Sequence, residues 1–563
     1  MHTEPPSKHI VTMAIPVLPP FSKLASTIDS RGWSWHWYHV VYLLLAWQTA
    51  QILWKFWWKV PSNVIIAAYP TPLGRFLTAL YMVFDSGTLL EKAYESAGGK
   101  PFAIPMLDRW IIFVSNTETL KQLDREPEHV LSLQQALHEL ASTGPILGPH
   151  QVKIENKGTQ SEVSRVVVGV LKNKLRSNIP LMSDTLRERV RKSMALEMSP
   201  PANEACEKNE WRQVRLMPVL LRIFTSVNLL PLVGDEQANR PEVYDDVMNF
   251  FWSCARAFPI VDTMPSFLTP FIGPIAMGWG VTRTKVYDLL LWHTTKALED
   301  KEVGREKQHS GGHVAQWASE ITKLRDAAEV AKISLGLLFA SAFQVPMVGQ
   351  DQYNPTVCVT IHTEDPAAQV VQFCIHRLCR HEEYTDKLRQ EALECENLSF
   401  GAMNREMPYL DSFMKETSRL SPGPIVSAPR TVMVPYTMED GCHIPAGNWI
   451  AIPQLALMRD EKIWPNGKEF EGFRFVDEQG DASESRFTHP SHEFPFWGSI
   501  KHACPARFYV SVVIKMVLSH LLLDYDFKLE NPTAAPFLTF GKVRVPSPFM
   551  TLLIRKRSTG SRV

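Results

Sequence analysis

The chain has no excess of charge of either sign, since its 59 basic residues balance its 59 acidic ones. No basic stripe stands out, which argues against a nucleic-acid-binding protein. The eight cysteines lack both metal-finger spacing and a disulfide framework, so free thiols in a reducing compartment are expected. Between residues 60 and 560 there are no linkers, internal repeats or low-complexity tracts. We therefore expect one large domain rather than several.

Formal charge is also absent from residues 32–54, whose centre is strongly apolar. A helix needs about 20 residues to cross the hydrocarbon core of a membrane, and this stretch is just long enough. Tryptophans crowd both of its ends, as they do at membrane interfaces: Trp33, Trp35, Trp37, Trp54, Trp57 and Trp58. We predict a transmembrane anchor over residues 33–58, preceded by a disordered extension over residues 1–32. A buried or peripheral helix is the alternative.

What the sequence does contain is a cysteine at the start of a predicted helix. Apolar residues recur at helical spacing from Ala506 to Leu523, and Pro505 suits a first helical position. Free backbone N–H groups and the helix dipole would favour a thiolate at Cys504. Such a thiolate can be a nucleophile or a metal ligand, and the alternative is a small buried residue. A haem fits this site, because its iron binds a thiolate and its propionates bind cations. The flanking cations are Lys501, His502 and Arg507.

The segment Trp497-Gly-Ser-Ile-Lys-His-Ala-Cys-Pro-Ala-Arg-Phe508 resembles the haem-binding loop of the cytochrome P450 family, the haem-thiolate monooxygenases. Its His-Ala-Cys-Pro-x-Arg-Phe part is similar to the fungal membrane-bound branch. The resemblance implies that Cys504 is the axial ligand of the haem iron. It also implies that Trp497, in place of the family's common Phe, contacts the haem. Ile500 replaces the family's usual Gly, and a branched side chain there is expected to strain a tight β-bulge.

A second motif lies upstream, where the residues from Met407 to Pro422 predict a helix that ends at Ser-Pro. Glu416 and Arg419, three residues apart, share one face of this helix and can pair. By resemblance to the family, Arg474 from a later loop joins them. The resemblance implies a structural cluster that serves folding and haem loading, because the loss of one member leaves a buried charge unpaired.

The same resemblance implies that Arg430 contacts a haem propionate, and His502 is a comparable candidate. For Arg430 the alternative is a solvated surface side chain. Residues 440–441, Asp-Gly between alternating apolar residues, predict a hairpin turn in a small sheet. Residues 425–426 and 537–539 are expected to line an apolar pocket.

The family's long central helix is interrupted in this chain. Residues 328–342 resemble its first half, but residues 343–361 contain two prolines, a glycine and a β-branched cluster, which do not suit a buried helix interior. We predict an insertion here, either native or translated from a retained intron. If the register resumes at His362, Thr363 is the catalytic residue whose hydroxyl assists proton delivery to oxygen. His362 or Glu364 then occupies the acid position.

The resemblance implies a mainly α fold with a minor β-sheet region, the cytochrome P450 fold, over residues 59–557. The implied activity inserts one oxygen atom from O2 into a lipophilic substrate, in a fungal secondary-metabolite pathway with terpenoids as one option. The implied cofactor is haem b, and NADPH supplies electrons through a flavin reductase. The catalytic domain is expected to face the cytosol from the endoplasmic reticulum membrane. Two alternatives stay open: a haem-binding membrane protein with impaired oxygenase activity, and an isomerase or dehydratase on the same haem.

Overall fold

The structure is a computed structural model that divides the chain into two units, Met1–Gln51 and Ile52–Val563. It describes residues 42–47, 49–50, 59–141, 143–152, 166–198, 210–263, 268–303, 313–321, 326–343, 366–395, 403, 406–480, 485–540, 542–547 and 550–557.

In the first unit the described residues, 42–47 and 49–50, are helical and exposed. The anchor predicted over residues 33–58 therefore lies mostly outside the described residues. The extension predicted over residues 1–32 lies wholly outside them.

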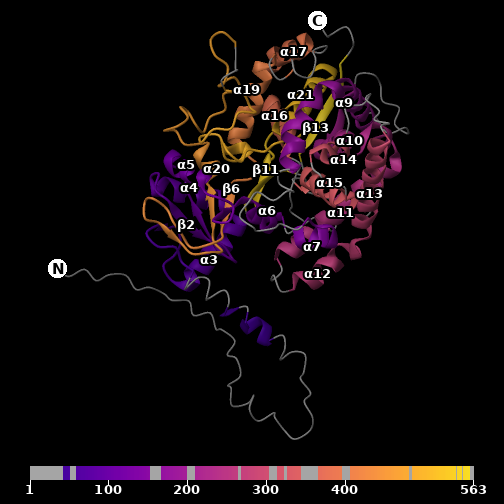
Figure 1. The fold of residues 1–563 in the computed structure, drawn as a ribbon. Helices are drawn as coiled ribbons and strands as arrows, with labels where there is room; N and C mark the ends of the chain where they lie inside the picture. The colour runs from indigo at the N-terminus through magenta and orange to yellow at the C-terminus, as the bar shows by residue number, and fades with distance from the viewer. Residues whose placement is uncertain are drawn as a thin grey trace, which may run out of the picture. The chain divides into compact units, whose positions relative to one another are not determined.

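The second unit is mainly helical, as the sequence predicts, and its small sheets are separate: β2 and β6 lie on the left of Figure 1, and β13 lies among the helices toward the upper right. Its first helices are α3 (Pro72–Phe84), α4 (Ser86–Ala97), α5 (Thr117–Arg125), α6 (Leu133–Ala141), α7 (Thr143–Leu147), α9 (Arg176–Glu197), α10 (Leu216–Ala238), α11 (Pro241–Thr263) and α12 (Thr269–Ala276). They are followed by α13 (Val281–Glu302), α14 (Val314–Ile321), α15 (Ala327–Phe343), α16 (Pro366–Arg380), α17 (Thr385–Glu394), α19 (Pro408–Leu420), α20 (Gln454–Leu457) and α21 (Arg507–Asp524).

The largest sheet has six strands in the order β1-β2-β3-β9-β6-β4. A three-stranded sheet has the order β10-β13-β5, and two hairpins pair β11 with β12 and β7 with β8. The strands are β1 (Ile65–Ile66), β2 (Phe102–Pro105), β3 (Trp110–Phe113), β4 (Leu131–Ser132), β5 (Arg212–Arg215), β6 (Ser427–Val432), β7 (Tyr436–Thr437), β8 (His443–Ile444), β9 (Trp449–Ile452), β10 (Tyr525–Leu529), β11 (Phe537–Phe540), β12 (Val543–Pro546) and β13 (Thr551–Lys556). The hairpin predicted at residues 440–441 is confirmed, since these residues join β7 to β8 and Gly441 has a φ of 85°.

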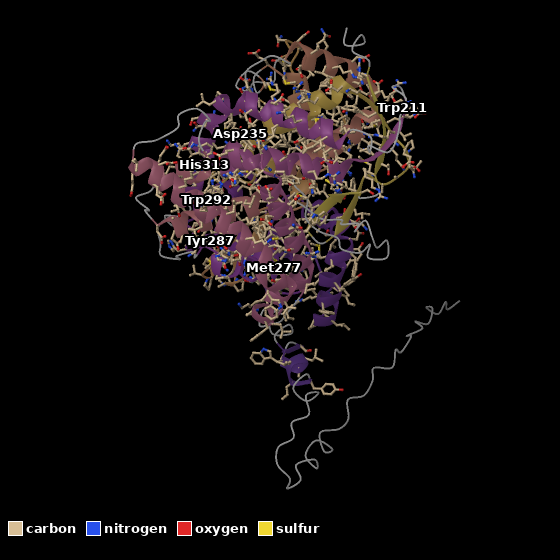
Figure 2. All side chains as sticks on the ribbon, turned by 90° about the vertical axis from the view of Figure 1, so that its right-hand side faces the viewer. Trp211, Asp235, Met277, Tyr287, Trp292 and His313 are labelled. Atoms are coloured by element: carbon tan, nitrogen blue, oxygen red, sulfur yellow. The ribbon has the colours of Figure 1, made fainter. Side chains whose placement is uncertain are left out.

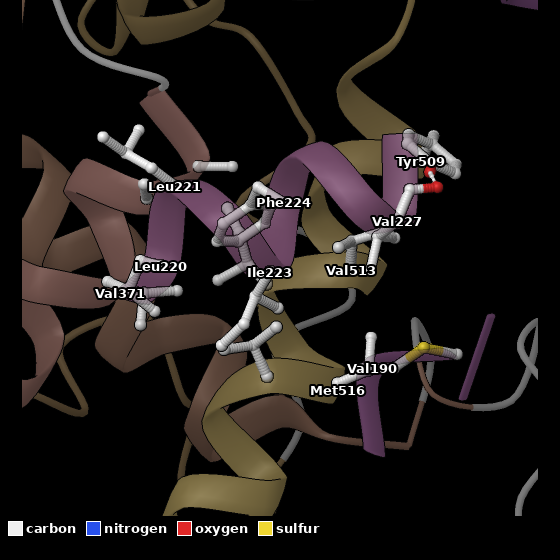
Figure 3. Packing of buried hydrophobic residues seen from close by; sticks show 14 of the residues in the cluster. Val190, Leu220, Leu221, Ile223, Phe224, Val227, Val371, Tyr509, Val513 and Met516 are labelled. Carbon is white, nitrogen blue, oxygen red and sulfur yellow. Dashed lines mark hydrogen bonds between the residues drawn. The ribbon is translucent and has the colours of Figure 1, made fainter. Parts of the chain in front are cut away.

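The apolar residues form two cores. The larger core packs α9, α10, α16, α19 and α21 together, and the smaller one fills the space between the six-stranded sheet and α3 and α4. Figure 3 shows part of the larger core, where Phe224 and Val227 of α10 face Val513 and Tyr509 of α21. Both cores bury branched and aromatic side chains almost completely, so α21 and the large sheet are fixed elements on which a site can be built.

One helix of the described residues, α10, is long and apolar enough to cross a membrane. However, 78% of its apolar window is buried inside the protein. A helix whose whole circumference is apolar is expected in the core of a large domain as well as in a membrane. The burial identifies α10 as a core helix.

The central helix predicted over residues 328–342 is confirmed as α15, and the helix expected after the insertion is present as α16. Residues 344–365, between the two helices, lie outside the described residues. Most of the predicted insertion, together with His362, Thr363 and Glu364, therefore falls there, and the structure does not test these predictions.

The side of the second unit that lies opposite the six-stranded sheet in Figure 1 contains α13 and its neighbours. Figure 2 shows His313, Trp292 and Tyr287 following one another down this side. The ring of Tyr287 stacks on His150 with centroids 4.0 Å apart, which ties α13 to the loop after α7. α13 also packs on α15, where the hydroxyl group of Tyr287 donates a hydrogen bond to the carbonyl oxygen of Ala328 at 3.4 Å.

Candidate functional site

Cys504 lies in a short loop between a buried turn at Pro495–Trp497 and the first residue of α21, Arg507. α21 begins one residue after the predicted start at Ala506, so Pro505 lies ahead of the helix rather than at its first position. The loop folds back at Gly498, which has a φ of 100°. A Cβ atom there would lie 2.9 Å from the carbonyl oxygen of His502, so only glycine fits this turn.

The backbone N–H of Cys504 donates a hydrogen bond to the carbonyl oxygen of Trp497 at 2.7 Å. Burial raises the pKa of the Cys504 thiol, although backbone N–H groups of Ala506 and Arg507 and the Arg507 charge oppose the rise. The N–H groups at the helix end thus favour the thiolate, as expected, but the cost of burying the anion exceeds their help. A metal ion bound to the sulfur would favour the thiolate further.

Trp497 is buried beside the loop and donates its indole N–H to the carbonyl oxygen of Phe487 at 2.6 Å. Its ring packs against Phe487 and Phe496, with centroids 5.0 and 5.1 Å away. The indole of Trp497 thus has a polar partner that the phenyl ring of Phe could not use.

Arg430 on β6 is buried, so the alternative of a solvated surface side chain is wrong. Its guanidinium lies 3.2 Å from Asp124 Oδ1, 3.9 Å from Glu128 and 3.5 Å from Ser499 Oγ. Asp124 also accepts a hydrogen bond from Ser499 Oγ at 2.6 Å. Asp124 has no motif around it and was not predicted from the sequence, yet this residue joins α5 both to Arg430 and to the cysteine loop.

His502 lies in the cysteine loop, two residues before Cys504. Its Nε2 atom is buried and has no hydrogen-bond partner among the described residues. Burial first, and then the charge of Arg430, lower the pKa of His502 to about 4. A buried nitrogen of this kind is usually satisfied by a bound group or by water.

Glu416, Arg419 and Arg474 meet as predicted. Glu416 lies 2.7 Å from Arg419 and 3.1 Å from Arg474, and both Glu416 and Arg419 are completely buried. Arg419 also donates to the carbonyl oxygens of Met458 and Gly467 at 2.5 and 2.6 Å. The cluster joins α19 to the chain after β9, and its described donors and acceptors are all protein groups.

Ile500 does not strain the loop in the way that the sequence suggested. Its side chain is 48% exposed, and its backbone is not among the described residues with positive φ. A branched side chain fits because the turn takes its positive φ at Gly498 instead. The departure from the family's Gly therefore gives no argument for an impaired site.

The two segments expected to line a pocket lie beside each other. Ile425 is buried, and its N–H donates to the carbonyl oxygen of Lys542 at 3.0 Å. Pro424 forms an isolated bridge with Val543, so residues 423–426 run along the β11–β12 hairpin that carries residues 537–539.

The residues around Cys504 fit a haem. The sulfur of Cys504 can bind the haem iron, and the unpartnered Nε2 atom of His502 and the buried guanidinium of Arg430 suit carboxylates. Among the described residues there is no group of three or more His, Cys, Asp or Glu side chains that could hold a metal ion by themselves. A porphyrin needs only one protein ligand to its iron, so the single cysteine is sufficient.

Comparisons with known proteins agree on one family. The sequence profile described as Cytochrome P450 matches residues 363–553. "Cytochrome P450 monooxygenase 151" of Postia placenta is 25% identical over 533 residues, which cover 92% of this chain and 99% of that protein. "Cytochrome P450 monooxygenase olcJ" of Penicillium canescens is 28% identical, covering 69% of this chain and 70% of that protein. A solved structure titled "Retinoic acid bound cyanobacterial CYP120A1" has the same fold, with a TM-score of 0.59, 16% identity and coverage of 83% and 94% of the two chains.

Proposed function

The chain belongs to the cytochrome P450 family, and from this premise we propose that Cys504 is the thiolate that binds the haem iron. The protein is a haem-thiolate monooxygenase that inserts one oxygen atom from O2 into a lipophilic substrate. Its cofactor is haem b, and its electrons come from NADPH through a reductase. The observation that carries the assignment of the ligand is the position of Cys504, held by the Trp497 carbonyl group at the start of α21.

The haem, when bound, supplies the oxygen-activating chemistry, and the surrounding residues have separate roles in our proposal. Arg430 and His502 hold its propionates, because the guanidinium of Arg430 and the Nε2 atom of His502 are buried beside the cysteine loop and can donate to carboxylates. Trp497 packs beside the loop and excludes water from the sulfur. Glu416, Arg419 and Arg474 are structural residues for folding and haem loading.

Thr363 remains the proposed residue for proton delivery, although it lies outside the described residues. The family profile begins at residue 363, which supports a resumption of the family's register there. We further propose that residues 343–361 are an insertion. A protein lacking them should still bind haem, and Thr363→Ala in that protein should consume NADPH while releasing peroxide instead of product. Loss of haem binding on removal of the insertion would withdraw Thr363 from the site.

We also propose that the protein is anchored in the endoplasmic reticulum membrane with its catalytic unit in the cytosol. Exposed apolar side chains on α3 and α12 support contact with a lipid surface, and both helices lie at the lower end of the unit in Figure 1. They include Leu73, Leu77 and Phe84 of α3 and Phe271 and Ile275 of α12. The full-length protein should stay on membranes that are washed with high salt or carbonate, and deletion of residues 1–58 should release it. Full-length protein that washes off in carbonate would contradict a spanning anchor.

The partner is proposed to be an NADPH-dependent flavin reductase, and the pathway a fungal secondary-metabolite pathway, with terpenoids as substrates to be screened. The test is turnover with NADPH, a fungal flavin reductase and a panel of lipophilic compounds. Substrate-dependent consumption of NADPH and O2 with an oxygenated product is the expected result. Conversion of a substrate without a reductase would instead favour an isomerase or dehydratase.

A further inference from the structure

Two hydrogen bonds hold the cysteine loop to one short stretch of backbone, residues 485–488, which we call the clamp segment. Trp497, seven residues before Cys504, donates its indole N–H to the carbonyl oxygen of Phe487 at 2.6 Å. Arg507, three residues after Cys504, donates its Nε–H to the carbonyl oxygen of Thr488 at 2.9 Å. The clamp segment therefore holds the loop on both sides of its cysteine.

The clamp segment is in turn held by two side chains of α19. Asp411 Oδ2 accepts a hydrogen bond from the backbone N–H of Phe487 at 2.6 Å, and Lys415 Nζ donates to the carbonyl oxygen of Ser485 at 2.7 Å. Phe487 thus uses its N–H for Asp411 and its carbonyl group for Trp497. The backbone of Phe487 therefore links Asp411 of α19 to Trp497 of the cysteine loop.

Asp411 is fixed by a buried charge on α21. Lys515 Nζ lies 2.6 Å from Asp411 Oδ1, and the two side chains are 0% and 4% exposed. Because α21 begins just after Cys504, the bonds form a closed ring. The ring runs from Cys504 to Trp497 through the bond at 2.7 Å, then through Phe487, Asp411 and Lys515 back to α21.

We propose that Asp411 and Lys515 are a positioning pair for the thiolate, acting through Phe487 and the indole N–H of Trp497. The inference rests on the proposed function, since it concerns Cys504 as the ligand of the haem iron. A thiolate keeps its bond to iron only if the loop holds the sulfur in place and keeps the cysteine from being protonated or replaced. A buried ion pair is a rigid support for such a loop because neither charge can leave it without a large desolvation cost.

The Asp411–Lys515 pair and the neighbouring Glu416 cluster contact different segments of backbone. Arg419 and Arg474 contact backbone between residues 458 and 469, whereas Asp411 contacts the clamp segment. Damage to either helix face lowers stability, but only the Asp411 face leads to the cysteine loop. A spectroscopic signature of the iron–sulfur bond can separate the two effects.

The test compares Trp497→Phe and Asp411→Asn with a matched control, Ser412→Ala, in the full-length, haem-loaded protein. Ser412 is equally buried on α19, but its hydroxyl bridges Gly472 and Phe475 at 3.0 Å each and does not contact the clamp segment. The readouts are the fraction of ferrous carbon-monoxide complex with the absorbance band of thiolate ligation, the rate at which that band decays, and the reduction potential.

Trp497→Phe keeps the ring and removes one donor, so the thiolate band should decay roughly fivefold faster, in keeping with the loss of one buried hydrogen bond. Asp411→Asn should act in the same direction and more strongly, because it also leaves Lys515 without its counter-charge. Ser412→Ala should leave the band and the potential as in the wild type. If Asp411→Asn fails to fold, Trp497→Phe alone decides.

Equal decay rates in wild type, Trp497→Phe and Ser412→Ala would overturn the positioning role. If Cys504→Ser keeps the thiolate band, Cys504 is not the ligand of the haem iron, and the proposed function of this site is wrong. The two failures are therefore distinguishable in one set of spectra.

Discussion

Two buried charge clusters lie near the cysteine loop, and they differ in how completely their charges are matched. Glu416 receives two hydrogen bonds from Arg419, one from Arg474 and one from the N–H of Glu471, all between 2.7 and 3.1 Å. Arg430, by contrast, lies at 3.2 Å or more from its nearest carboxylate, Asp124. We call the cluster of Glu416, Arg419 and Arg474 closed, because its charges are matched at short distances, and the cluster around Arg430 open, because its contacts are longer.

The difference indicates separate roles. In the closed cluster the described donors are already used by the protein, so it can only hold the fold together. The open cluster combines long contacts around Arg430 with a buried, unpartnered nitrogen on His502, so it can accept a further acidic group. Charge matching thus distinguishes a scaffold from a binding site where burial alone does not, since Arg419 and Arg430 are both buried.

The largest expected effect comes from breaking the closed cluster. Glu416→Ala leaves Arg419 and Arg474 without their shared carboxylate in a buried position, which costs about 3–5 kcal/mol of folding free energy. We expect little or no folded, haem-containing protein, measured by soluble yield and by denaturant unfolding. Glu471→Ala is the control, because Glu471 also pairs with Arg474 but is 44% exposed, and this change should cost less than about 1 kcal/mol. Similar losses in the two variants would contradict the distinction.

A smaller effect is expected from Arg430→Gln in the open cluster. The change leaves Asp124 with Ser499 as its remaining side-chain partner and costs about 1.5–3 kcal/mol, the worth of a charged hydrogen bond. Its main consequence should be weaker haem retention in a protein that still folds, measured as the ratio of haem to protein after gel filtration. Arg430→Lys keeps the charge but not the planar guanidinium group, so its haem retention should lie between those of the wild type and Arg430→Gln. Unchanged retention in Arg430→Gln would remove Arg430 from the haem site.

The smallest effect is a pH dependence from His502. Its pKa in the folded protein is about 4, below the ordinary value of 6.5, so the folded state keeps the ring neutral. As the pH falls from 6.5 toward 4, the unfolded chain gains a proton that the folded protein does not, and stability decreases over that window. In the haem-free protein, where no propionate contacts His502, His502→Gln should make this decrease shallower in unfolding curves recorded from pH 7 to pH 4. An unchanged slope in the haem-free protein would contradict a neutral, buried His502 in the folded state.

The residues that sequence could identify are those with a local pattern. Cys504 stands in a motif of adjacent residues, and the spacing of Glu416 and Arg419 on one helix face leads directly to their ion pair. Asp124 and Lys515 have no such pattern, because α5 and α21 meet their partners only through tertiary packing. The sequence also could not show that burial raises the pKa of the Cys504 thiol, since burial depends on the surrounding elements rather than on the helix end.

The helical fold and the hairpin between β7 and β8 were likewise predictable, because apolar periodicity and Asp-Gly turns are local signals. The order of the six-stranded sheet was not, since it pairs β3 with β9 across more than 300 residues. Such pairings depend on which faces the two cores bury.

The most direct test of the account is the ligand itself. Cys504→Ser and Cys504→His, compared with Cys379→Ser as a control for another half-buried free cysteine, should be examined as ferrous carbon-monoxide complexes. The account predicts that both Cys504 variants lose the absorbance band of thiolate-ligated haem and that the Cys379 variant keeps it. An unchanged band in either Cys504 variant would contradict the assignment of Cys504 as the ligand of the haem iron.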